Sequence, residues 1–287
     1  MTARNLLARG IAVALASAVG PAGIAAQSPA PRSADAIFLT TVTLPGGTAV
    51  LGNTGATVGE AHERPVHEVE LAPFAIGTHE VTQAQFEAVM GYNPSFDRDP
   101  ARPVEQVSWY DAVRFCNVLS RLEGLAPAYA IHPFDGYALD AAADGYRLPS
   151  EAEWAYAAKA GTRADTYAGE LAAADGTSEM LEPIAWYDAG DGEPRTRPAG
   201  QKRPNALGLY DVLGNVFEWT GDAFAAYPGG RIDPDAPGAD RAPQLRVLRG
   251  GAMDARPTYV RAAYRYRLHP SYTSYNVGFR VARSVRR

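Results

Sequence analysis

Residues 246–251 read Arg-Val-Leu-Arg-Gly-Gly, and the chain runs on through Arg261-Ala-Ala-Tyr-Arg-Tyr-Arg267 and His269-Pro270 to Val277-Gly-Phe-Arg280. Short apolar runs predict strands at residues 246–249 and 278–282, with an irregular segment rich in tyrosine and arginine between them. No cysteine follows Cys116. The chemistry of this segment must therefore come from aromatic, basic and histidine side chains.

Three helices are predicted from one start signal, a hydroxyl side chain followed three residues later by Gln, Asp or Glu. The pairs are Thr82 with Gln85, Ser108 with Asp111, and Ser150 with Glu153. The glycines expected to end the helices are Gly91, Gly124 and Gly161. The three helices are then about 9, 15 and 11 residues long. Further strands are expected at residues 36–44 and 66–71, and residues 162–208 are expected to be mostly loop.

The composition is that of an ordinary globular protein with much irregular backbone. Apolar residues make up 46% of the 287 residues and charged residues 21%, with 28 glycines and 22 prolines. The net charge of -5 gives no basic face for nucleic acid or for an anionic membrane. We expect neither partner. The sequence leaves the oligomeric state open, and a monomer is one expectation.

The first residues have the pattern of an export signal. Arg4 and Arg9 precede a short apolar run at residues 11–19, and small residues continue to Ala26. The run is too short to span a bilayer. We expect a cleaved signal peptide at residues 1–26, a flexible lead-in at 27–35 and one domain at 36–287. The mature protein is then periplasmic or secreted.

The single cysteine excludes an intramolecular disulfide. Cys116 shares a predicted helical face with Ala112, Phe115 and Leu119. We expect a small core residue there rather than a reactive thiol.

Several segments, taken in order, resemble the formylglycine-generating enzyme family, also called sulfatase-modifying factors. Besides the C-terminal stretch they are Pro65-Val-His-Glu-Val-Glu-Leu71, Glu80-Val-Thr-Gln-Ala-Gln-Phe86, Pro103-Val-Glu-Gln-Val-Ser-Trp-Tyr-Asp-Ala112, Tyr146-Arg-Leu-Pro-Ser-Glu-Ala-Glu-Trp154 and Gly208-Leu-Tyr-Asp-Val-Leu-Gly-Asn-Val-Phe-Glu-Trp219. They cover nearly the whole chain after the leader. The resemblance implies an α+β, C-type-lectin-like fold with little regular secondary structure.

The resemblance also implies a structural calcium ion in the loop at residues 211–218. Asp211 and Glu218 would bind it through their side chains, and Gly214 and Val216 through their carbonyl oxygens, as suits a hard cation. Read from the residues alone, the same acids could instead cap a helix or face solvent. A second calcium site of the family has no clear counterpart here.

The copper-dependent members of the family use two cysteines that this chain lacks. Counting back from Gly278, the later cysteine aligns with Pro257 and the earlier one falls between Ala252 and Ala255. Neither alanine nor proline can ligate copper(I), which prefers sulfur. Copper bound through cysteines and formylglycine formation in sulfatases are therefore not expected, and any redox cofactor is unknown.

Aromatic and basic side chains of the C-terminal segment are the candidate ligand-binding groups. The expected catalytic residues are Tyr264, Arg265 and His269, of which the tyrosine and the histidine could transfer protons. The expected substrate-binding residues are Trp109, Arg261, Tyr266, Arg267, Tyr272 and Tyr275. Stacking and arginine–carboxylate pairs would suit a peptide or peptide-derived ligand. For each of these residues, packing in the core or pairing with a structural acid is the alternative.

Two functions remain open. The first is a cysteine-independent oxidative modification of a peptide-derived substrate, as in relatives that mature the chromophore of a pyoverdine-type siderophore. The second is a non-catalytic, lectin-like binding or accessory protein. The sequence contains no nucleophile elbow, phosphate loop, zinc helix or nucleotide fingerprint, so classical hydrolases and nucleotide-using enzymes are excluded.

Overall fold

The computed structural model describes residues 39–57, 59–132, 136–171, 179–190, 192–230 and 244–285. They belong to one compact unit, Ser33–Arg287. The expected leader and lead-in therefore lie outside the described residues. Within the described ranges, no helix has the length and apolar character needed to cross a membrane.

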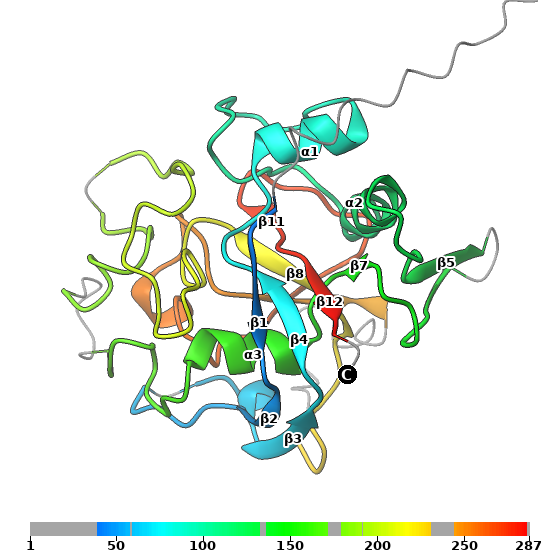
Figure 1. The fold of residues 1–287 in the computed structure, drawn as a ribbon. Helices are drawn as coiled ribbons and strands as arrows, with labels where there is room; N and C mark the ends of the chain where they lie inside the picture. Colours follow the sequence, from blue (N-terminus) through cyan, green and yellow to red (C-terminus); the bar gives the residue numbers. More distant parts are fainter. Residues whose placement is uncertain are drawn as a thin grey trace, which may run out of the picture. The chain divides into compact units, whose positions relative to one another are not determined.

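Two four-stranded sheets and two hairpins make up the β-structure of the described residues (Figure 1). The first sheet has the order β1(Thr41–Leu44), β4(Phe74–Gly77), β12(Ala282–Ser284), β7(Tyr146–Arg147). The second has the order β10(Tyr266–Leu268), β9(Arg246–Arg249), β8(Phe217–Ala223), β11(Val277–Gly278). The hairpins pair β2(Gly47–Leu51) with β3(His67–Leu71), and β5(Tyr129–His132) with β6(Gly136–Leu139). Only the β8–β11 pair is parallel among these described strands.

The three predicted helix starts are confirmed. The helices are α1(Gln83–Met90), α2(Trp109–Leu122) and α3(Glu151–Lys159), and each opens with a complete capping box. Gly91 ends α1 in the left-handed conformation, as expected. The other two helices end earlier than predicted: α2 stops two residues before Gly124, and α3 stops before Ala160, which itself has a φ of 48°. Two short 3-10 turns, Ala61–Glu63 and Pro257–Tyr259, complete the helical structure described.

The strand predictions were confirmed in part. The strand at residues 246–249 is present, and those expected at 36–44 and 66–71 are shorter. The single strand predicted at residues 278–282 was wrong. Residues Phe279, Arg280 and Val281 are fully buried, and the chain passes there from the second sheet to the first. Two short strands, β11 and β12, flank this crossing.

The core lies among the two sheets and the three helices. Three buried tryptophans fill it, and each donates its indole N–H: Trp109 to the Thr220 carbonyl, Trp219 to the Val107 carbonyl and Trp154 to Glu218. Helix α3 contacts β2, β3, β8 and β9. Residues 179–190 and 192–216 contain no helix or strand, so the loop prediction for the described part of 162–208 is confirmed except for isolated bridges. The α+β class with low regular content is confirmed.

Candidate functional site

The predicted calcium loop is a tight turn that precedes β8. Asp211, Gly214 and Asn215 all have positive φ, at 50°, 78° and 56°. A Cβ at Gly214 would lie 2.1 Å from the carbonyl oxygen of Trp186. The turn is therefore pressed against residue 186 and needs glycine there.

Buried acids gather around this turn. Asp211 accepts a hydrogen bond from the backbone N–H of Gly200 through Oδ2 (2.6 Å), whereas its Oδ1 has no partner among the described residues. Glu80 accepts from the Asn215 amide (2.7 Å) and from the backbone N–H of Val216 (3.1 Å). Burial, and then the nearby charges of Asp211 and Glu218, raise the pKa of Glu80 well above its ordinary value. Burial also raises the pKa of Asp211.

One arginine partly offsets these charges. Glu218 accepts from Nε and Nη2 of Arg280, at 2.6 Å each, and from the indole N–H of Trp154 at 2.8 Å. Three carboxylates, Glu80 included, thus face one guanidinium.

These residues fit a cation in part. The acid excess and the open oxygen of Asp211 suit calcium, while Glu218 is largely occupied by Arg280. No cluster of three or more His, Cys, Asp or Glu side chains in the described ranges is arranged to hold a metal. A calcium ion would therefore depend on backbone carbonyls, as the predicted use of Gly214 and Val216 requires.

Two residues predicted to bind substrate, Trp109 and Arg261, and the predicted catalytic residue Arg265 lie in the interior. Trp109 is 2% exposed, and the Arg246 guanidinium lies 4.1 Å from its ring. Arg261 makes a bidentate pair with Glu63, at 2.8 and 2.9 Å. Arg265 makes another with Glu151, at 2.7 and 2.9 Å. The arginine–acid pairing that we gave as the alternative is thus present at both arginines.

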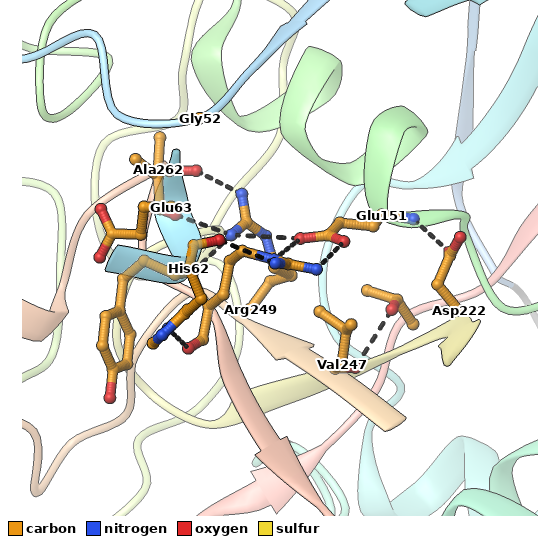
Figure 2. A network of polar contacts seen from close by, with 12 residues as sticks. Gly52, His62, Glu63, Glu151, Asp222, Val247, Arg249 and Ala262 are labelled. Atoms are coloured by element: carbon orange, nitrogen blue, oxygen red, sulfur yellow. Dashed lines mark hydrogen bonds and ion pairs between the residues drawn. The ribbon is translucent and has the colours of Figure 1, made fainter. Parts of the chain in front are cut away.

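The Arg265–Glu151 pair belongs to a buried polar network around Glu151 (Figure 2). Arg249 donates to the carbonyls of Ala262, Ala263 and Tyr264 and lies 3.7 Å from Glu151. Asp222 accepts from the backbone N–H of Glu151 at 2.6 Å. Arg249 and Arg265 thus both lie at the carboxylate of Glu151. The network ties the C-terminal segment to α3.

The remaining predicted residues, apart from the buried Tyr264, are more exposed. Tyr266 stacks on Phe217 at 5.0 Å, and the mostly buried Tyr264 contacts Tyr259 at 4.8 Å. His269 bonds through Nδ1 to the hydroxyl of Ser271 at 2.7 Å. Arg267 lies 4.7 Å from the ring of Phe224, and Tyr272 is exposed. Their predicted roles stay predictions.

A cleft of about 610 Å³ lies beside the segment where the family's earlier cysteine aligns. Its lining residues are Phe96, Asp97, Glu105, Gln106, Glu193, Pro194, Arg195, Thr196, Met253 and Tyr275. We call it the Met253 cleft, because Met253 lies in the segment from Ala252 to Ala255 where that cysteine aligns. Met253 also lines a neighbouring hollow of about 240 Å³ beside Trp186. Of the predicted substrate-binding residues, the cleft includes Tyr275.

Sequence reasoning missed the opposite wall of this cleft. Gln106 has a φ of 59°, an uncommon conformation for a residue other than glycine and one often found at functional sites. Glu105 is 1% exposed and lies in the run Val104-Glu-Gln-Val107, whose valines are fully buried. An acid beside Gln106 in a run that begins and ends with valine was the signal available in the sequence.

Comparisons with known proteins agree with this fold. Residues 27–285 match the model of the Sulfatase-modifying factor enzyme 1-like domain. The chain is 38% identical to the chaperone protein LppX of Paenibacillus barcinonensis over 183 residues. These aligned residues make up 53% of this chain and 62% of LppX. It is 32% identical to the Pkn1 kinase of Chlamydia trachomatis over 81% of this chain, but spans 36% of that kinase.

Other similarities extend over most of both proteins. The formylglycine-generating enzyme of Streptomyces coelicolor is 30% identical over 91% of this chain and 95% of its own. Treponema denticola variable protein 1 superposes with a TM-score of 0.71 and 31% identity, over 85% of this chain and 95% of that one. PvdO from Pseudomonas aeruginosa superposes with a TM-score of 0.66 and 27% identity, over 85% of this chain and 94% of PvdO. The chain therefore belongs to the sulfatase-modifying factor family.

Proposed function

We propose that this protein modifies a peptide or peptide-derived substrate bound in the Met253 cleft. The observation that carries the proposal is the position of the cleft. It lies at the segment where the family's cysteine-using members are expected to do their chemistry, and Met253 lines it. Its volume of about 610 Å³ is that of a ligand-sized pocket. Exposed rings of Phe96 and Tyr275 offer stacking surfaces at its edge.

The chemistry that we propose does not use cysteine. The chain has one cysteine, and Cys116 is fully buried with its pKa raised by burial. An oxidative version, such as maturation of a siderophore chromophore, removes two electrons and two protons from the substrate. The electrons would pass to an acceptor from solution such as dioxygen. Similarity to PvdO and to a formylglycine-generating enzyme over most of the chain supports a modifying enzyme.

A non-catalytic binding protein is the second candidate. The tyrosine-rich surface around Tyr259, Tyr266 and Tyr272 favours it, because exposed tyrosines give large contact areas at low entropic cost. Similarity to Treponema denticola variable protein 1 is compatible with this reading.

We also propose a structural calcium ion at residues 211–218 and export through the leader at residues 1–26. The open Asp211 oxygen and the local acid excess support the ion. The basic, apolar and small-residue pattern of the leader supports export to the periplasm or beyond. Detection of the protein in extracytoplasmic fractions, with an N-terminus near Gln27, tests the second proposal.

Metabolite profiling of a deletion strain and its supernatant against wild type tests the proposed function. We expect a peptide-derived precursor to accumulate and to disappear when the wild-type gene is restored. Tyr275→Ala should fail to restore the profile. Tyr92→Ala, which changes a similarly exposed tyrosine outside the cleft, should restore it. An unchanged profile under inducing conditions would favour the binding protein instead.

A further inference from the structure

Glu105 lies in the wall of the Met253 cleft with its two carboxylate oxygens in different surroundings. Oε1 accepts hydrogen bonds from the backbone N–H groups of Phe96 (2.5 Å) and Asp97 (3.1 Å). Oε2 is buried and has no hydrogen-bond partner among the described residues. Leaving a buried polar atom without a partner is unfavourable, and more so for a charged group. A bound ligand could remove this cost.

The charges around the cleft leave Glu105 uncompensated. Asp97 forms an ion pair with Arg102, and Glu193 pairs with Arg195 at 3.0 Å. Within the described part of the chain, Glu105 forms no ion pair. An ionised Glu105 therefore gives the cleft one net negative charge that the protein itself does not neutralise.

Two aromatic rings stand at the opening of the same cleft. Phe96 is 82% exposed and Tyr275 is 45% exposed. The hydroxyl of Tyr275 donates to Asp254 at 2.9 Å, which holds the ring in place. Aromatic faces attract cations. The buried acid in the wall of the cleft and the exposed rings at its opening both favour a positively charged ligand group.

We infer that the Met253 cleft recognises a primary ammonium group of its ligand, which binds to Oε2 of Glu105. The inference rests on the proposed function and narrows its substrate class to lysine-like, amine-bearing peptides or their derivatives. An ammonium is favoured over a guanidinium because Oε1 already accepts two N–H groups. Only one oxygen remains, which excludes the bidentate pairing that arginine-like groups prefer.

The ionisation of Glu105 gives this recognition a pH dependence. Burial raises its pKa to about 7, the backbone N–H groups of Asp97 and Phe96 oppose the rise, and the charge of Asp97 adds to it. The other charged groups lining the cleft are Glu193 and Arg195, which pair with each other. An ammonium binds the ionised acid. Affinity should therefore rise as pH increases through about 7 and should fall below it.

Calorimetry with two short peptides tests the inference. The probes are acetyl-Gly-Lys-Gly-amide and the same peptide acetylated on the lysine side chain, titrated into the whole protein at about pH 8. We expect the lysine peptide to bind at least about tenfold more tightly than its acetylated form. Glu105→Gln should weaken the lysine peptide by at least about tenfold and remove the difference between the two. Glu68→Gln, the same change on an exposed acid of β3, should alter neither affinity.

Other outcomes would overturn the inference. Equal binding of the two peptides, no binding of either, or an unaffected Glu105→Gln variant would each show that the cleft does not recognise an ammonium group. A melting temperature for Glu105→Gln at or above that of the wild type would verify that the variant folds. The proposed function is judged separately by the metabolite profile. If Glu105→Gln restores that profile and Tyr275→Ala does not, the proposed function is supported and recognition of an ammonium group by Glu105 is rejected.

Discussion

Glu218 and Arg280, 62 residues apart in the chain, form a fully buried bidentate ion pair with both contacts at 2.6 Å. The pair joins β8 to the crossing between the two sheets. Nη1 of Arg280 also donates to the Gly77 carbonyl and Nη2 to the Tyr210 carbonyl. One guanidinium thus bridges the first sheet, the turn before β8 and the second sheet.

Arg280→Met should destabilise the protein by about 3–5 kcal/mol, because it leaves the Glu218 charge buried without its partner. Chemical denaturation would measure the loss. The double variant Glu218→Gln with Arg280→Met removes both charges and should cost less than the sum of the two single variants. An additive double variant would contradict a direct coupling between the two side chains.

Asp211→Asn should separate a calcium ligand from a merely buried acid. In chelator, the neutral amide relieves repulsion with Glu80 and Glu218, so the variant should be at least as stable as the wild type. With excess calcium, the wild type should gain about 2.7 kcal/mol at a concentration 100 times its Kd, whereas the variant should gain little. Thermal melts with calcium and with chelator make the comparison.

Asp211 is the informative position because changing Glu218 would also break the pair with Arg280. Loss of stability in a Glu218 variant would therefore occur with or without calcium. A wild-type melting temperature that is the same in calcium and in chelator would reject the calcium assignment.

The elements predicted correctly from the sequence are those specified by residues close together in the chain. All three helix starts were readable because a capping box needs only two residues three positions apart, such as Ser150 and Glu153. Strands β4 and β8 were missed. Their partners lie far away in the chain, and β8 carries Glu218 and Asp222 among its apolar residues. Local patterns contain no information on such pairings.

The same limit explains why parts of the candidate site were assigned wrongly or missed. Arg265 and Arg261 were read as possible ligand contacts because their acids, Glu151 and Glu63, lie 114 and 198 residues away. The position of the Met253 cleft follows from bringing residues near 96, 105, 193, 253 and 275 together. The family resemblance identified the C-terminal wall of this cleft, but the opposite wall needed the fold.

Asp222→Asn should stabilise the protein at neutral pH. Burial raises the pKa of Asp222 from 3.8 to about 6, so the folded state holds this proton more tightly than the unfolded chain does. The cost of ionising it in the fold is fully present above about pH 6 and is relieved as pH falls toward 4. The gain should be about 1–2 kcal/mol at pH 7 to 8, less than the full shift implies because the side chain is only half-buried.

Denaturation of both proteins across this pH range would measure the gain. The advantage of Asp222→Asn should shrink between about pH 6 and 4 and vanish below that range. Asparagine retains an oxygen that can accept from the backbone N–H of Glu151, so the hydrogen bond is preserved. An advantage that stays constant with pH would show that Asp222 does not titrate differently in the two states.

Gly214→Ala should be far more damaging than Gly208→Ala, although the two glycines have nearly the same φ, 78° and 79°. Both variants incur the cost of a left-handed conformation, about 1 kcal/mol. A Cβ at Gly208 meets no atom within 4 Å, whereas a Cβ at Gly214 would lie 2.1 Å from the Trp186 carbonyl oxygen. The backbone must therefore shift in Gly214→Ala, and we expect a total loss of about 3 kcal/mol or more. The difference between the two denaturation free energies isolates the steric contact, since the conformational cost is common to both. Equal losses would mean that the turn before β8 is free to move away from residue 186.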